Sequence, residues 1–299
     1  KKNVKKKRFF KAADPEKKPP FIIRGVLVIT SMLVSFSHGS NDGQKGVGLM
    51  MIILISLLPA KFALDQSKNA SNMIGNIRTI ETYLAEADTT RMDASYKLHF
   101  NTVKTDLEEI KTAIFNSDIS SEIDENKRFQ VRSDIITIAR SIELIIGDPE
   151  KRGCLNLSDS KISHLKTNIN ELKSFTEFAP WWVLALISVS LGMGTMIGWK
   201  RIVTTIGEKI GKTPMTYAQG TSSGLIAFST IILASVFGLP VSTTHVLSSG
   251  VAGTMASEGG VKNLQPQTLK NIAIAWVVTI PVTIIISCLL FLLFRWLFV

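Results

Sequence analysis

Two short polar stretches interrupt otherwise apolar sequence, and they hold the residues whose types could do chemistry. The first, at 38–45, reads HGSNDGQK and includes Asn41, Asp42 and Lys45. In a membrane a charged side chain costs about 2.5–3.5 kcal/mol on insertion scales, so it normally faces protein or a water-filled cavity. The Asp42 carboxylate suits a cation, and the glycines let a helix unwind and restart, with free N–H groups that suit an anion. We therefore predict an ion pathway here.

The second stretch, at 238–245, reads GLPVSTTH. Pro240 stops a helix from continuing. Three adjacent hydroxyls then stand at the start of the next helix, on Ser242, Thr243 and Thr244. Hydroxyls and backbone N–H groups at a helix N-terminus can surround a tetrahedral oxyanion without adding charge. This composition predicts an anion site.

His245 closes the second stretch. It could donate a hydrogen bond to the anion or carry a proton, because histidine exchanges protons near physiological pH. The simpler alternative is that Ser and Thr cap helices and that the glycines allow close helix packing. We prefer the chemical interpretation because two such stretches occur, one with an Asn-Asp pair and one with three hydroxyls. No metal-ligand or catalytic cluster is evident, so we expect neither a metal, a cofactor nor an enzyme.

The elements around these stretches are predicted to be membrane helices. Residues 179–198 and 271–294 carry no charge. About 20 apolar residues suffice to cross a hydrocarbon core of roughly 30 Å. We therefore expect 179–299 to form transmembrane helices with a broken segment at 238–245.

Charge asymmetry predicts the side of the membrane on which each part lies. Residues 1–20 form a basic leader with nine Lys/Arg, and residues 199–212 form a second basic stretch. Both are expected in the cytoplasm, whereas residues 65–178, with 19 acids against 15 Lys/Arg, are expected outside. Residues 21–64 must then cross an odd number of times. This favours one long transmembrane segment, broken at 38–45, over a hairpin.

Residues 65–178 differ in composition from the rest of the chain, being rich in charge and poor in Pro and Gly. The stretch VKTDLEEIKTAIF, from Val103, repeats apolar residues with the period of an α-helix. This predicts a soluble helical insert, as a small bundle. The net charge of +10 does not indicate a nucleic-acid partner, because the excess Lys and Arg cluster beside predicted spans.

The polar stretches resemble the signatures of a known family. GSND at 39–42 resembles the GAND signature of the inorganic phosphate transporter family, and PVSTTH at 240–245 resembles its second signature. The string SHGSNDGQKGVGL is similar to that of bacterial low-affinity Pit-type members. The resemblance covers 21–63 and 179–299. It implies an all-α polytopic membrane protein with two inverted repeats, each carrying both signatures and containing broken helices or re-entrant segments. One copy of each signature is present, so we expect the second repeat, with the first absent.

The resemblance also implies roles for individual residues. The Asn-Asp pair would take part in cation and phosphate binding, and the three hydroxyls would coordinate phosphate. Many members continue GAND with VANA, whereas Lys45 stands here where an Asn often sits, which puts a sodium-binding role of that position in doubt. The predicted phosphate ligands are Asn41, Ser242, Thr243 and Thr244. The predicted coupling-ion or proton residues are Asp42, Lys45 and His245.

We expect protons rather than sodium as the coupling ion. Lys45 follows Asp42 by three residues, a spacing that brings the side chains together on a helical turn. The ammonium could then neutralise Asp42 in place of a metal cation and attract phosphate. A proton would enter through Asp42, His245 or the phosphate itself.

The predicted function is symport of inorganic phosphate, free or as a metal–phosphate complex, across the cell inner (plasma) membrane. Expected partners are protons or sodium, the missing N-terminal repeat, the lipid bilayer and, as one option, a second copy in a homodimer. The alternatives are sodium-coupled phosphate symport and a carrier of the same fold for another oxyanion such as sulfate. A more distant one is a membrane receptor with an external helical domain, which would need a cytoplasmic signalling coil after residue 200.

Overall fold

The computed structural model of the protein is all-helical, as the sequence predicts. It describes residues 8–12, 18–88, 90, 93–115, 123–148, 152–197 and 199–298. Across these residues there are eleven α-helices, and the β-type pairings are two isolated bridges. Most of the predicted leader at 1–20 lies outside the described residues. The chain forms two compact units, one of Lys1–Gly46 with Ala185–Val299 and the other of Val47–Leu184.

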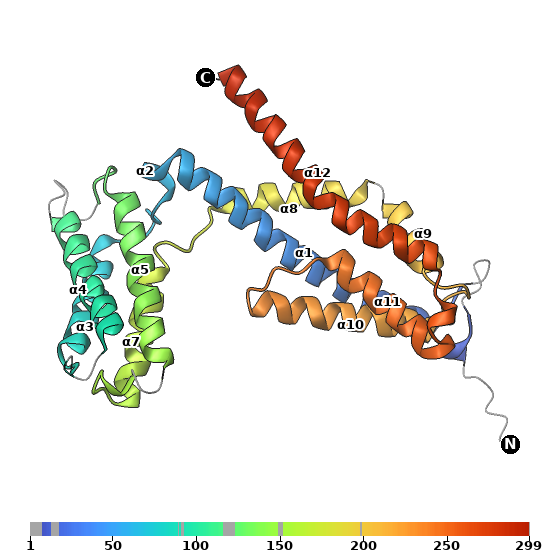
Figure 1. The fold of residues 1–299 in the computed structure, drawn as a ribbon, viewed down its shortest axis with the longest axis horizontal. Helices are drawn as coiled ribbons and strands as arrows, with labels where there is room; N and C mark the ends of the chain where they lie inside the picture. Colours follow the sequence, from blue (N-terminus) through green and yellow to red (C-terminus); the bar gives the residue numbers. More distant parts are fainter. Residues whose placement is uncertain are drawn as a thin grey trace. The chain divides into compact units, whose positions relative to one another are not determined.

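The first unit contains both signature stretches and most of the apolar helices (Figure 1). Its helices are α1 (Phe21–Leu57, as far as Gly46), α8 (Trp181–Met196, from Ala185), α9 (Trp199–Glu208), α10 (Tyr217–Val236), α11 (Thr243–Gly259) and α12 (Pro266–Phe298). Its 3₁₀ turns are η1 (Arg8–Phe10) and η3 (Val261–Asn263). By length and composition, α1, α10 and α12 are long and apolar enough to cross a membrane.

Of the two uncharged segments predicted to span the membrane, one lies in a helix long enough to do so and the other does not. Residues 271–294 lie within α12, whose segment Pro266–Leu293 is a candidate span. Within the predicted span 179–198 the structure has α8, which covers only the 16 residues Trp181–Met196. At 1.5 Å per residue, α8 is about 24 Å long, short of a hydrocarbon core of roughly 30 Å. It is an apolar helix without the length of a full span.

The break predicted at 38–45 is absent, and α1 is an unbroken helix of 37 residues. Gly39 and Gly43 each cost the helix about 1 kcal/mol relative to alanine. An unsatisfied backbone group in hydrocarbon costs several kcal/mol, so keeping the hydrogen bonds within the helix is favoured despite the glycines. A single helix also leaves no hairpin in this part of the chain.

The interruption predicted at 238–245 is present, between the end of α10 and the start of α11. Gly238 has a φ of 66°, in the left-handed region that glycine adopts at no steric cost. Its N–H donates to Ser235 O at 3.3 Å, and the Leu239 N–H donates to Ala234 O at 2.8 Å. These two bonds form the Schellman motif that closes many helices, and a proline often follows it, as Pro240 does here.

α1 lies against α10 at a point where only a small residue fits. A Cβ added to Gly224 of α10 would come 2.5 Å from Thr30 Cγ2 of α1, and Thr30 is buried. α11 packs closely on α10 as well, because a Cβ on Gly250 would lie 3.3 Å from Ser223 O. The glycines at 224 and 250 thus let α1 and α11 pack closely on α10.

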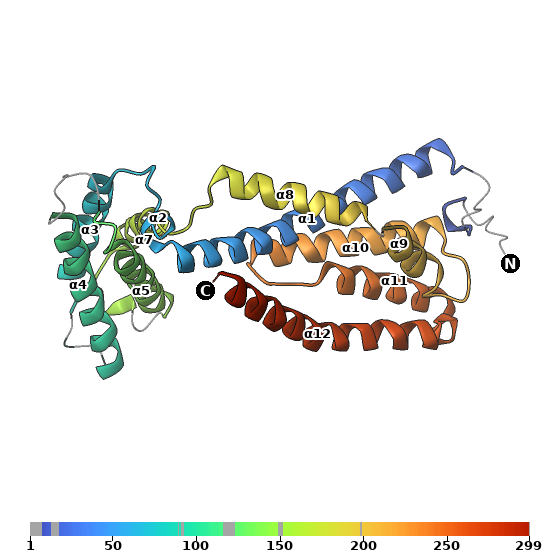
Figure 2. The same ribbon diagram turned by 90° about the horizontal axis from the view of Figure 1, so that it is seen from above.

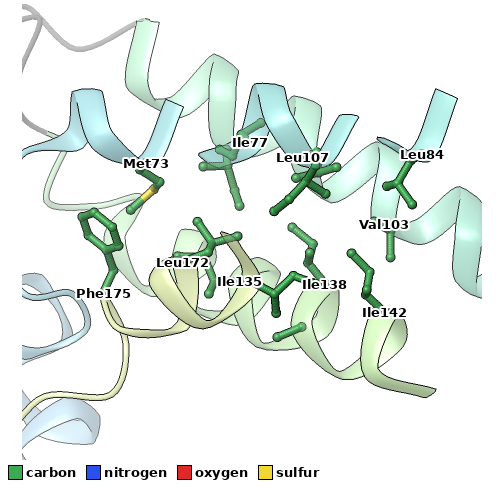
Figure 3. Packing of buried hydrophobic residues seen from close by; sticks show 14 of the residues in the cluster. Met73, Ile77, Leu84, Val103, Leu107, Ile135, Ile138, Ile142, Leu172 and Phe175 are labelled. Carbon is green, nitrogen blue, oxygen red and sulfur yellow. The ribbon is translucent and has the colours of Figure 1, made fainter. Parts of the chain in front are cut away.

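The second unit is a helical bundle with its own hydrophobic core. Its helices are α2 (Pro59–Phe62), α3 (Ala70–Ala85), α4 (Ala94–Phe115), α5 (Arg128–Gly147) and α7 (Asp159–Lys173). Asn69 and Ser158 cap α3 and α7 with their side chains. Hydrophobic side chains from α3, α4, α5 and α7, with Phe175 just after α7, meet in the interior. Figure 3 labels Met73, Ile77, Leu84, Val103, Leu107, Ile135, Ile138, Ile142, Leu172 and Phe175 of this core.

This bundle buries one carboxyl group without full compensation. Asp134 of α5 is 4% exposed; Gln130 Nε2 donates to its Oδ1 at 2.8 Å, while its Oδ2 is buried without a partner. Burial, followed by the negative charge of Asp106, raises the pKa of Asp134 to about 6. Burial and the charge of Glu109 also raise the pKa of Asp106.

We predict that the bundle becomes more stable as the pH falls from 7 toward 4. The folded state holds the Asp134 proton more tightly than the unfolded state, so the stabilisation is complete below the ordinary pKa of 3.8 and is lost as the pH rises through about 6. For one proton, the unfolding equilibrium constant changes by at most about tenfold per pH unit. Hydrogen–deuterium exchange of the α5 amides in the full chain measures this change.

Asp134→Asn should stabilise the bundle at pH 7 and remove most of the change in its stability between pH 7 and 4. Glu171→Gln, at an exposed acid, is the control and should leave the profile unchanged. A profile that Asp134→Asn does not alter would contradict the prediction.

Candidate functional site

Because α1 is continuous, four polar side chains of the first signature lie along one face of it. Positions i, i+3, i+4 and i+7 of a helix share a face. Here these positions are His38, Asn41, Asp42 and Lys45. A broken helix would not have aligned them, so the site depends on the intact α1.

Lys45 forms an ion pair within α1 and also reaches the interrupted segment. Its Nζ donates to Asp42 Oδ1 at 3.2 Å and to Val241 O at 2.5 Å. The predicted closeness of Lys45 and Asp42 is thus confirmed. Both side chains remain accessible, at 41% and 29% exposure, so they line a surface that an ion can reach.

His38 connects the carboxylate to the start of α11. Its Nε2 lies 3.7 Å from Asp42 Oδ2, and its Nδ1 lies 2.8 Å from Thr243 Oγ1. Which group of the His38–Thr243 pair donates depends on the histidine tautomer. A carboxylate, an imidazole and a hydroxyl therefore stand in sequence between α1 and α11.

Asn41 presents a buried oxygen with no partner. The residue is 2% exposed; its Nδ2 donates to Ser235 Oγ at 3.0 Å, and its Oδ1 is unsatisfied. The Ser235 hydroxyl already donates its single hydrogen to Ile231 O at 3.0 Å, so toward Asn41 it can only accept. This orients the amide and leaves Oδ1 as an acceptor for a cation or for a hydrogen-bond donor.

The second signature forms the N-terminus of α11. Ser242 is the N-cap, and its side chain accepts a hydrogen bond from the His245 N–H. The amides of Thr243 and Thr244 come earlier in the helix, among those that an α-helix leaves without intrahelical partners. These amides and the positive end of the helix dipole favour an anion.

The structure brings most, though not all, of the predicted residues together. Asn41, Asp42 and Lys45 lie on α1, and through His38 their cluster joins Thr243. Thr244 is exposed near the same helix end. The His245 ring stacks on Trp276 of α12, with centroids 3.9 Å apart and planes 36° apart. Among the described residues, no polar side-chain contact links His245 to Asp42.

Two residues of the cluster escaped the sequence analysis. Ser235 lies inside α10 and carries no local signal. His38 stands four residues before Asp42, and side chains at that spacing are neighbours on a continuous helix. Because a break was expected at 38–45, this contact was not predicted. In the part of the chain that the structure describes, no group of three His, Cys, Asp or Glu side chains could hold a metal ion.

The model of the phosphate transporter family matches residues 3–287. The chain belongs to the phosphate transporter family. The predicted resemblance is confirmed, and with it the assignment to membrane transporters rather than enzymes.

The individual proteins that the chain resembles are also phosphate transporters. The chain is 38% identical to a low-affinity inorganic phosphate transporter of Buchnera aphidicola subsp. Acyrthosiphon pisum, over 94% of the chain and 58% of the relative. It is 37% identical to the low-affinity inorganic phosphate transporter PitA of Escherichia coli K12, over 92% of the chain and 58% of PitA. The chain thus spans under two thirds of these relatives. No solved structure matches it.

We predict that Ser242 acts mainly as the cap of α11. Ser242→Ala should cost about 1 kcal/mol of stability, whereas Ser242→Asn, which can still cap, should cost little. Thermal unfolding of the purified protein in detergent measures the difference. Ser249→Ala, at an exposed serine in the middle of α11, serves as the control. If Ser242→Ala and Ser242→Asn melted alike, the hydroxyl would have no capping role.

Proposed function

We propose that this chain forms half of a secondary carrier that moves inorganic phosphate across the bacterial inner membrane by symport with protons. One observation carries the proposal: the polar face of α1 meets the N-terminus of α11, through Lys45–Val241 and His38–Thr243. An ammonium, two hydroxyls and free helix amides lie around that junction. The Pit relatives, which are named as phosphate transporters, support phosphate as the cargo.

Phosphate would bind at the start of α11, beside α1. Thr243 and Thr244 would donate from their amides and hydroxyls, which bind an oxyanion without adding charge. Lys45 would add a single positive charge at the same place. Asn41 fits less directly, because its amide N–H donates to Ser235; its Oδ1 could accept from a protonated phosphate oxygen. Ser242 would contribute through the cap that keeps the helix end in place.

The rest of the carrier would supply the other half of the site. The chain covers 58% of PitA, and much of the apolar surface of α12 is exposed. Carriers built of inverted repeats place their substrate near the midplane, between the repeats. A second repeat over the described cluster would close the site and bury that surface.

Protons are the proposed coupling ion because the charge of Asp42 already has a partner. The Lys45 ammonium lies 3.2 Å from Asp42 Oδ1 and so occupies one position at which a sodium ion could bind the carboxylate. Asp42, His38 and Thr243 stand in a row, along which a proton could pass once the 3.7 Å between Asp42 Oδ2 and His38 Nε2 shortens to a hydrogen bond. His38 therefore joins the predicted residues Asp42, Lys45 and His245. Sodium coupling is the second candidate, and the unpartnered Asn41 Oδ1 is the observation that favours it.

Asp42→Asn in the full-length carrier should abolish phosphate uptake while the protein still inserts and folds. The amide cannot hold the negative charge that pairs with Lys45, although the hydrogen bond from Lys45 to Val241 can remain. Uptake of radiolabelled phosphate by cells lacking other phosphate carriers measures the effect, with protein level checked by immunoblot. Asp124→Asn, at an exposed acid of the bundle, is the control. Normal uptake by a well-expressed Asp42→Asn carrier would refute the assignment.

Thr243→Val and Thr244→Val should each weaken phosphate binding by roughly ten- to a hundredfold. A hydrogen bond to a charged group contributes about 1.5–3 kcal/mol, which corresponds to that range. Thr243→Ser keeps the hydroxyl and should bind nearly as the natural protein does. Thr254→Val, farther along α11, is the control. Binding of radiolabelled phosphate to the detergent-solubilised carrier measures the affinity, and unchanged values in both valine variants would contradict the site.

The coupling ion can be separated from the cargo in proteoliposomes. We expect phosphate to accumulate when an inward proton gradient is imposed without sodium. A sodium gradient with equal pH on both sides and zero membrane potential should drive no accumulation. Accumulation under the second condition would refute proton coupling and leave the phosphate assignment intact.

A further inference from the structure

α9 is a short amphipathic helix with an apolar stripe. Trp199, Ile202, Val203 and Ile206 occupy positions i, i+3, i+4 and i+7 of it, which lie on one face. The opposite face carries the polar residues of the same ten-residue helix. Neither the phosphate site nor the predicted spans give this stripe a role.

Hydrogen bonds in the segment after α9 place this helix beside the starts of two candidate spans, α10 and α12. The Gln265 N–H donates to Ile210 O at 2.9 Å, and the Lys212 N–H donates to Asn263 O at 2.7 Å. These bonds join the segment that leaves α9 to the segment that leads into α12, and α10 begins nearby at Tyr217. Figure 2 shows α9 at the end of this unit where α10 and α12 begin. α9 therefore lies where two candidate spans start, which would be the level of a membrane surface if α10 and α12 cross the bilayer.

In the part of the chain that the structure describes, side chains cover only one end of the apolar stripe. Ile206 packs against the small core of Ile210, Val251 and Met255. Trp199, Ile202 and Val203 are 58%, 55% and 57% exposed. A large tryptophan and two branched aliphatic residues are thus left open along one face.

The surroundings of the stripe are basic. Lys200 on α9 is exposed, and so are three lysines in the adjoining segments and at the start of α12, Lys209, Lys212 and Lys270. The exposed acid on α9 is Glu208. Lysine chains can lie along apolar surface and place their ammonium groups at the headgroups. This positive charge complements the negative surface of anionic lipids.

We propose that α9 lies in the plane of the membrane surface and binds anionic lipid. Its apolar stripe enters the boundary between headgroups and acyl chains, and Lys200, Lys209 and Lys212 contact negatively charged headgroups. Tryptophan at the start of the helix suits this depth, since its ring is apolar and its N–H polar. The inference requires that α10 and α12 span the bilayer, but it does not depend on the cargo or the coupling ion.

Site-directed spin labelling of the full-length carrier in liposomes tests the orientation. After replacement of Cys154 and Cys288, a nitroxide is placed at Ile202→Cys or, on the opposite face, at Thr204→Cys. We expect the label at 202 to be accessible to oxygen, which concentrates in lipid, and the label at 204 to a water-soluble nickel chelate. Equal access of the chelate to both labels would overturn the proposal. A label at 202 that neither agent reaches would also overturn it, because another part of the protein would then cover the stripe.

Lipid selectivity tests the charge component. Spin-labelled phosphatidylglycerol should associate with the carrier more strongly than spin-labelled phosphatidylcholine, and the preference should fall severalfold in K200Q/K209Q. The matched control K97Q/K166Q removes two exposed lysines of the bundle and should keep the full preference. An equal loss in both variants, or no loss in K200Q/K209Q, would contradict binding of anionic lipid by these lysines.

Discussion

The ion pair between Asp42 and Lys45 depends on α1 remaining helical through its glycines. In a low-dielectric surrounding, an isolated charge is costly and a paired one much less so. The helix places the two side chains three residues apart, with Lys45 Nζ 3.2 Å from Asp42 Oδ1. The same two turns of α1 place Lys45 within reach of Val241 and His38 within reach of Thr243. The continuity of α1 thus brings the polar side chains of 38–45 into contact with the second signature at 240–245.

The second signature has the complementary geometry, because its helix begins where the polar face of α1 lies. The Schellman motif at Gly238 ends α10, Pro240 prevents its continuation, and Ser242 starts α11. Thr243, which is buried, and the exposed Thr244 then stand in the first turn of α11, and the Lys45 ammonium reaches Val241 just before it. Neither stretch alone forms a site for a charged cargo. Together they offer positive charge, hydroxyls and amides to an anion, with Asp42 and His38 available for a proton.

Much of this arrangement could be predicted from the sequence, because the signals were local. The all-helical class, the interruption at Pro240 and the closeness of Asp42 and Lys45 follow from composition and spacing. The break at 38–45 was wrongly expected because glycine lowers helix propensity by less than the loss of backbone hydrogen bonds costs in a membrane. Ser235 as the partner of Asn41, and the contact of His245 with Trp276, arise from packing between distant segments. No local pattern predicts such contacts.

Solid-state NMR of the full-length carrier can test most directly that phosphate binds between α1 and α11. With lysine labelled at ¹⁵Nζ, dipolar dephasing by the ³¹P of bound phosphate reports which ammonium touches the cargo. If phosphate binds between α1 and α11, a lysine signal should dephase in the natural protein, and this dephasing should be lost in Lys45→Gln. Dephasing that persists unchanged in Lys45→Gln would place phosphate elsewhere and refute binding between α1 and α11.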